Sequence, residues 1–203
     1  MSPQNRKILF IKKLLFFSLV FFLFINATGI NPEKSIEANK NTFPKNTSIK
    51  FPFLQKNFVG FKEAVAFRES QGKYHVVNTL GYLGKYQFGR TTLERFRIYN
   101  TQGFLKNPEL QEKAFAAYCA VNKWILRKDI RRSVGKTING IKITESGILA
   151  AAHLSGAGNV KKYIRSRGKT RFSDAYGSTI QSYLKKFAGY DVSNIKADRK
   201  ATV

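Results

Sequence analysis

The stretch FVGFKEAVAFRESQGKYHVVNTLGYLGKYQFG, residues 58–89, decides how this chain is expected to fold. Its first half spaces Phe58, Phe61 and Val65 three and four residues apart, as on one stripe of an α-helix. Glu69 continues this stripe four residues later. A glutamate on the core-facing side of a helix is costly to ionise, and a protonated carboxylic acid is what glycosidic bond cleavage needs. Alternatively, Glu69 marks only the hydrated helix end, because a glycine typical of a C-terminal cap follows three residues later.

The second half of the stretch is expected to form a short β-hairpin or loop after this helix. Residues 74–77 are aromatic and β-branched, residues 78–81 form a turn signal, and residues 84–88 can return as a second strand. Aromatic side chains in a polar, glycine-rich loop often stack on sugar rings, although each can equally cover the underside of a hairpin. Tyr82 and Tyr86 are therefore candidate sugar contacts.

The composition of the chain says more about its binding partners than about its fold. The chain has 203 residues and a hydrophobic share of 43%, which is ordinary for a globular protein with one domain and its extensions. Its net charge of +24 predicts an anionic partner, such as nucleic acid, acidic lipid or an anionic wall polymer. Cys119 is the only cysteine, so no intramolecular disulfide can form, and its alanine-rich surroundings predict a core residue rather than a catalytic thiol.

Residues 1–29 have the pattern of an export signal. Four basic residues within the first 13 positions precede an apolar run over 14–25, and small residues follow at 27 and 29. This run is shorter than the roughly 20 residues of a membrane span, and an uncleaved N-terminal anchor is the alternative. In both cases the rest of the chain is expected in the periplasm or outside the cell. Residues 30–56 are polar, rich in Asn, Lys and Pro, and without helical periodicity, which predicts a flexible linker.

Residues 57–190 show the patterns of a mainly α-helical domain, with about six helices and one short β-hairpin after the first. The helix after Asn107-Pro108 is expected to run to about residue 128 and to be the central core helix. The Asn-Gly pair at 139–140 predicts a tight turn. Residues 191–203 are expected to be a polar, frayed tail. Other helix caps are predicted at Thr91 or Thr92, Thr144, Asn159 and Ser178.

Three short blocks along the chain carry a resemblance. They are Glu-Ser-x-Gly at 69–72, Gly-Lys-Tyr-Gln at 84–87 and Ala-Ala-His-Leu-Ser-Gly-Ala-Gly at 151–158. In this order they resemble the signature motifs of the soluble lytic transglycosylases, lysozyme-like enzymes of the bacterial cell wall. The family patterns are Glu-Ser, Gly-Leu-Met-Gln and Ala-Tyr-Asn-x-Gly, so this chain departs from the family in the second and third blocks. The resemblance implies a lysozyme-like α+β catalytic domain over 57–190.

The resemblance also implies roles for single residues. Glu69 matches the catalytic glutamate, Gln87 matches a glutamine that lines the cleft, and His153 matches a residue that faces the saccharide. A half-buried structural histidine is the alternative for His153. No metal or cofactor is expected, because two histidines and one cysteine far apart do not make a zinc site and no nucleotide-binding fingerprint is present. Further candidate substrate contacts are Ser70, Asn78, Tyr82 and Tyr86.

The small number of acidic residues bears on the mechanism. A two-carboxylate glycosidase needs a second Asp or Glu about 5–9.5 Å from the acid. The chain has only 12 acidic residues, and Glu109, Glu112 and Glu145 are expected to be charges at helix starts. The carboxylates left open as a partner of Glu69 are Glu94, Asp129 and Asp174.

A single acid suits the transglycosylase reaction. Glu69 would protonate the glycosidic oxygen, the acetamido group of the substrate would stabilise the cation, and Glu69 would then take the proton of the 6-hydroxyl to close an anhydro ring. Lysozyme-type hydrolysis and a non-catalytic peptidoglycan-binding module are the alternatives. A monomer is expected, with peptidoglycan glycan strands and the anionic cell-wall surface as its partners. No nucleic acid is expected, since no nucleic-acid module is recognisable. The candidates for a polymer-tracking strip are Lys161, Lys162, Arg165, Arg167, Lys169 and Arg171.

Overall fold

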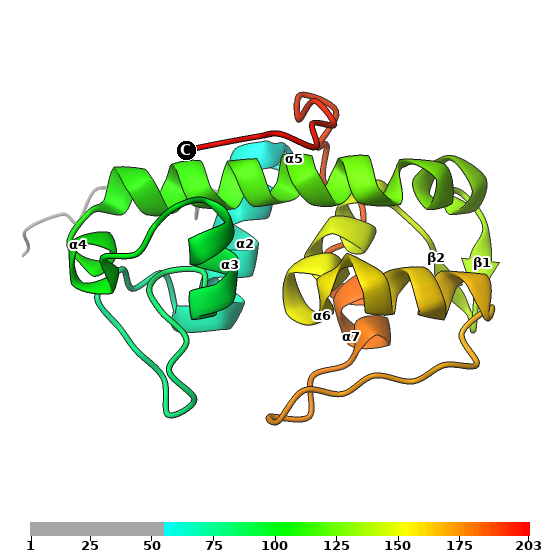
Figure 1. The fold of residues 1–203 in the computed structure, drawn as a ribbon. Coiled ribbons are helices and arrows are strands. Elements are labelled where there is room, and N and C mark those ends of the chain that lie inside the picture. The colour runs from blue at the N-terminus through cyan, green and yellow to red at the C-terminus, as the bar shows by residue number, and fades with distance from the viewer. Residues whose placement is uncertain (1–54) are drawn as a thin grey trace, which may run out of the picture. The chain divides into compact units, whose positions relative to one another are not determined.

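Six helices and one short antiparallel sheet make up residues 55–203, the part of the chain that the computed structural model describes (Figure 1). The expectation of a mainly α-helical domain with about six helices and a short two-stranded pairing is confirmed. The expected export signal and nearly all of the expected linker lie outside the described residues. The elements are α2 (Phe58–Ser70), α3 (Arg90–Arg95), α4 (Thr101–Leu105), α5 (Pro108–Ser133), β1 (Thr137–Ile138), β2 (Ile141–Lys142), α6 (Glu145–Arg165) and α7 (Ile180–Lys186).

Helix α5 runs along the whole domain. In the view of Figure 1, α3 and α4 lie below its N-terminal half and α2 crosses behind it, while α6, α7 and the sheet lie below its C-terminal half. Asn107 caps its start by accepting a hydrogen bond from the amide of Leu110 at 3.0 Å, and Pro108 fills the first position. The helix continues to Ser133, beyond the expected end near residue 128, because its last turns are also packed and Asp129 is buried.

The core lies where these helices meet. The small residues Ala150, Ala151 and Ala152 are fully buried, and they let α6 approach its neighbours α5 and α7 closely. Helix α2 buries Phe61 and Val65 as its apolar stripe predicts. Within the described residues, no helix combines the length and the apolarity that a bilayer crossing requires.

The two strands lie elsewhere than the expected hairpin. They pair across the Asn139-Gly140 turn, where both residues have positive φ, as the Asn-Gly signal predicts. The segment after α2 instead holds only isolated bridges, between Val77 and Leu83 and between Leu83 and Phe88. Its backbone turns too often to sustain a ladder.

Several predicted helix ends are wrong by one to three residues. Gly89 stands at the start of α3 instead of Thr91 or Thr92, and Thr179 caps α7 instead of Ser178. Gly156 has a φ of 76° and interrupts the helical backbone within α6. The chain resumes the helix directly, so Asn159 does not cap a new one; its Nδ2 donates to the carbonyl of Ser155 at 2.9 Å.

The expected frayed tail is also corrected. Val192 and Ile195 are buried in the core, with exposed fractions of 2% and 8%. The amide of Asp198 donates to the carbonyl of Ala120 at 3.1 Å, and Lys123 donates to the carbonyl of Val192. Two apolar side chains in a polar segment are enough to hold it against α5.

Candidate active site

Glu69 lies in the last turn of α2 and is half-buried. Gln71 follows with a φ of 58° and ends the helix by turning the chain into the next loop. Tyr183 of α7 donates a hydrogen bond from its hydroxyl to Glu69 Oε1 at 2.7 Å. Burial, and then the neighbouring Glu69 carboxylate, raises the pKa of Tyr183, so the phenol remains a hydrogen-bond donor. One carboxylate oxygen of Glu69 is therefore held in place.

Two hollows adjoin at Glu69. One has a volume of about 230 Å³ and the other about 520 Å³. Because both are lined by the same central residues, they form one groove that passes Glu69. The shared residues are Glu69, Asn78, Gln87, Asp174 and Tyr176.

The walls of this groove are the two loops that extend away from α5, one between α2 and α3 and one between α6 and α7 (Figure 1). The hydroxyl groups of Thr79 and Tyr176 lie 2.8 Å apart and join the two loops across the groove. Tyr82 also lines the smaller hollow and is 43% exposed, which suits an aromatic platform for a ligand. Asn78 accepts hydrogen bonds from the amides of Leu80 and Tyr82, so it shapes the loop as well as lining the groove.

Gln87 and His153 lie in the groove near Glu69. Gln87 has a φ of 51° and lines both hollows, while its Nε2 donates to the carbonyl of Gly84 at 2.9 Å. His153 lines the smaller hollow, and its Nε2 donates to the carbonyl of Tyr86 at 2.8 Å. Since a carbonyl only accepts, this contact places the proton of a neutral ring on Nε2. The ring also packs edge-on against Phe88, so His153 has a structural contact in addition to its place in the groove.

Two of the expected substrate contacts lie outside the groove. Ser70 lines neither hollow, and its hydroxyl donates to the carbonyl of Lys85 at 2.7 Å, which ties the end of α2 to the following loop. Tyr86 is fully buried, stacks on Phe115 with ring centroids 4.1 Å apart, and donates to Glu112. An irregular loop has no side-chain period, so the sequence could not show which of its aromatic residues face inward.

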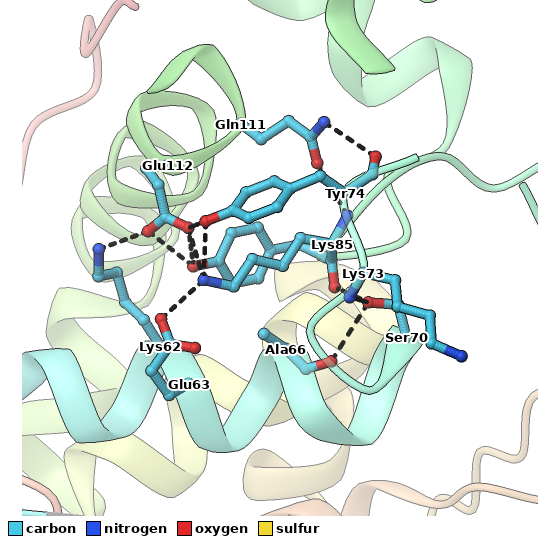
Figure 2. A network of polar contacts seen from close by, with 10 residues as sticks. Lys62, Glu63, Ala66, Ser70, Lys73, Tyr74, Lys85, Gln111 and Glu112 are labelled. Atoms are coloured by element: carbon cyan, nitrogen blue, oxygen red, sulfur yellow. Dashed lines mark hydrogen bonds and ion pairs between the residues drawn. The ribbon is translucent and has the colours of Figure 1, made fainter. Parts of the chain in front are cut away.

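A partly buried charge network supports this loop (Figure 2). Lys85 is 4% exposed, and its Nζ donates to Glu63 at 2.7 Å and to Glu112 at 2.8 Å. Glu112 also accepts from the hydroxyl groups of Tyr74 and Tyr86 and from Lys62. Glu112 was expected to be a helix-start charge. It is instead the centre of this network.

The network lowers the pKa of Glu112 and raises the pKa of Lys85. Burial alone would raise the pKa of Glu112, but the hydrogen bonds from Lys62, Lys85 and the two tyrosines outweigh it and lower the pKa to about 2. Burial alone would lower the pKa of Lys85, and its bonds to the two glutamates raise it instead. Both groups are therefore charged at neutral pH, and the loop that carries Asn78, Tyr82 and Gln87 is held by an ion pair.

The carboxylates left open as partners of Glu69 lie in different places. Glu94 is exposed on α3, and Asp129 is buried beside Arg132 and Arg165, away from the groove. Asp174 lines both hollows. Its Oδ1 accepts hydrogen bonds from the amides of Tyr176 and Ser178 at 2.9 Å and 2.7 Å, so this oxygen holds its own loop together.

Sequence reasoning missed Tyr183 and Tyr176, which no local pattern marks. Packing of segments more than 90 residues apart in the chain brings Tyr183 to Glu69 and Tyr176 to Thr79. Glu145 pairs with Lys123 at 2.9 Å, in keeping with the structural role expected of it. Among the described residues, no three His, Cys, Asp or Glu side chains gather in a way that could hold a metal ion.

Comparisons with protein-family models, with curated proteins and with solved structures found no significant match to this chain. The function is therefore argued from the groove itself.

Proposed function

We propose that this protein is an exported enzyme that cleaves peptidoglycan glycan strands, with Glu69 as its single catalytic acid and base. The observation that carries the proposal is the position of Glu69, half-buried in a groove between two loops and held by Tyr183 at 2.7 Å. The groove consists of two adjoining hollows that meet at Glu69, and such an extended groove suits a linear polymer better than a small molecule. The resemblance to soluble lytic transglycosylases supports the same residue.

The proposed reaction is the lytic transglycosylase reaction at the MurNAc-GlcNAc bond. With Oε1 held by Tyr183, Oε2 of Glu69 carries the proton that passes to the glycosidic oxygen as the C1–O4 bond breaks. The acetamido group of the substrate stabilises the resulting cation. The ionised Glu69 then accepts the proton of the 6-hydroxyl while O6 bonds to C1, so the acid is regenerated and no water is consumed.

The groove offers contacts for such a substrate. Tyr82, 43% exposed in the smaller hollow, provides a ring face for a sugar, and Asn78 and Gln87, which line both hollows, provide amide groups. The net charge of +24 suits a polymer that carries peptide carboxylates, and the export pattern of residues 1–29 suits a substrate outside the cytoplasm.

One observation favours lysozyme-type hydrolysis as a second candidate. Asp174 lines both hollows together with Glu69, and a second carboxylate in the groove is what hydrolysis requires. The hydrogen bonds that Asp174 Oδ1 accepts from its own loop argue for a structural role and leave transglycosylation as our first choice.

The test is clearance of a peptidoglycan suspension followed by mass spectrometry of the products. Glu69→Gln is expected to abolish clearance while binding to sacculi persists, and Glu94→Gln, the same change at an exposed glutamate outside the groove, is expected to leave it unchanged. Clearance that survives Glu69→Gln would refute the proposal. Binding without any clearance by the wild type would make the protein a non-catalytic module.

The products separate the two reactions. Anhydro-muropeptides identify the transglycosylase, whereas reducing ends identify the hydrolase. Asp174→Asn should remove the activity of a hydrolase and should leave the anhydro product of a transglycosylase, provided that the loop keeps its conformation.

A further inference from the structure

A second charged hollow lies at the C-terminal ends of α5 and α6. It has a volume of about 700 Å³ and shares no lining residue with the two hollows at Glu69. Among the residues that the structure describes, four cationic side chains line it, and Asp129 is the only acidic one. We refer to it as the basic hollow. Its cations are Arg132, Lys136, Arg165 and Arg167.

Asp129 orients two of these cations. Its side chain is 2% exposed, and its Oδ1 accepts hydrogen bonds from Arg132 Nη2 at 2.9 Å and from Arg165 Nε at 3.0 Å. Arg132 is held further by a bond from its Nε to the carbonyl of Lys128 at 3.1 Å. The side chains of Arg132 and Arg165 are 61% and 56% exposed, so each is fixed by Asp129 but still accessible to a ligand. A carboxylate that holds two arginines in this way prepares them for a further anion, since little side-chain freedom remains to be lost.

Helix dipoles alone do not explain these charges. Basic residues in the last turns of α5 and α6 stabilise the helix ends, and Arg132 and Arg165 have this role in part. Lys136 and Arg167 lie beyond the ends of both helices, and both side chains are exposed. The folded chain nevertheless brings all four cations around one concave space.

The chemistry of the lining points to phosphate. A planar guanidinium group forms paired hydrogen bonds with phosphate oxygens. The single carboxylate of Asp129 neutralises only one of the four positive charges, so a net positive charge remains to bind an anion. The volume is in the range of pockets that hold a whole ligand rather than one small ion. A bilayer surface fits less well, because the site is concave and only Ile138 and Ile164 line it with large apolar side chains.

We propose that the basic hollow binds phosphate groups of a flexible, soluble polyanion, at a site separate from the groove. The proposal does not rest on the proposed enzymatic activity, so Glu69→Gln protein can be used to test it. The probe is tripolyphosphate, measured by isothermal titration calorimetry at about 0.15 M salt, where exposed charges are already screened over about 8 Å.

Two matched double variants distinguish binding at the basic hollow from attraction by the net positive charge of the protein. Lys136→Gln with Arg167→Gln removes two charges from the basic hollow without touching Asp129, and we expect at least about tenfold weaker binding, as for the loss of charge-assisted hydrogen bonds. Arg131→Gln with Lys162→Gln removes two exposed charges from the last turns of the same helices, outside the hollow, and we expect less than about a twofold change. Equal weakening by both pairs would overturn the proposal.

For Asp129→Asn, the proposed site and simple attraction by net charge predict opposite changes in tripolyphosphate binding. This variant is more positive by one charge, so unspecific attraction predicts tighter binding, whereas loss of the anchor for Arg132 and Arg165 predicts weaker binding. Circular dichroism checks that Asp129→Asn folds. If this variant does not fold, the two double variants alone test the proposal. Tighter binding by folded Asp129→Asn would refute the proposal. So would binding of the wild type to phosphatidylglycerol vesicles but not to tripolyphosphate, because a membrane would then be the partner.

Discussion

The charge network beneath the groove loop leads to a quantitative prediction for Glu112→Gln. The pKa of Glu112 falls from an ordinary value of 4.5 to about 2 in the folded protein. At about 1.4 kcal/mol for each tenfold change in proton affinity, this carboxylate contributes about 3 kcal/mol to the free energy of unfolding at neutral pH. Its side chain is 22% exposed, so the contribution is not lost to solvent screening.

The pH dependence follows from the direction of this change. A carboxylate whose pKa is depressed in the folded state stabilises the protein above its unfolded pKa, and the stability is lost as the pH falls from about 4.5 towards 2. We therefore expect wild type to exceed Glu112→Gln by about 3 kcal/mol at pH 7 and by about 1 kcal/mol or less at pH 2.5.

Urea unfolding followed by the fluorescence of Trp124, the only tryptophan, measures both values. Glu109→Gln is the matched control, because Glu109 lies one turn earlier on α5 and pairs with Lys113 while 77% exposed. It should leave stability and its pH dependence nearly unchanged. An equal loss in both variants, or a Glu112→Gln difference that stays constant with pH, would refute the reasoning.

Three further predictions concern the loops and the groove. Gly84→Ala should lower the free energy of unfolding by about 1–3 kcal/mol in thermal melts, because φ is +74° and the new Cβ would lie 2.3 Å from Oε1 of the buried Gln111. Gly158→Ala, with open space around the Cβ, should be neutral or slightly stabilising, and equal losses at both glycines would contradict this account. Tyr183→Phe removes the donor to Glu69 and should slow peptidoglycan clearance about tenfold with unchanged circular dichroism, and an unchanged rate would remove Tyr183 from the proposed mechanism. Tyr176→Phe removes the hydroxyl that meets Thr79 and should speed amide hydrogen exchange over residues 77–82 in mass spectrometry, whereas unchanged exchange would mean that this contact does not hold the loop.

The two expected substrate contacts that lie outside the groove share a cause. Ser70 was expected to contact substrate because it stands in a motif-like block, and Tyr86 because it is an aromatic residue of a polar loop. The Ser70 hydroxyl instead bonds to the backbone of Lys85, and Tyr86 is buried on Phe115. The inward or outward direction of a side chain in an irregular loop depends on what packs beneath it. Glu112 lies on a helix and was misread for a different reason: its lysine partners, Lys62 and Lys85, come from segments 50 and 27 residues away in the chain.

The sequence by itself determined the helical class, the start of α5 at Asn107-Pro108, the start of α6 at Thr144 and the turn at Asn139-Gly140. These features are local, because a cap or tight turn is built from hydrogen bonds between residues only a few positions apart. Tertiary structure alone decided that Tyr183, 114 residues from Glu69, donates to that carboxylate, and that Thr79 meets Tyr176 across the groove. Such contacts arise from the packing of α2, α6 and α7 around a common core, and no spacing along the chain encodes them.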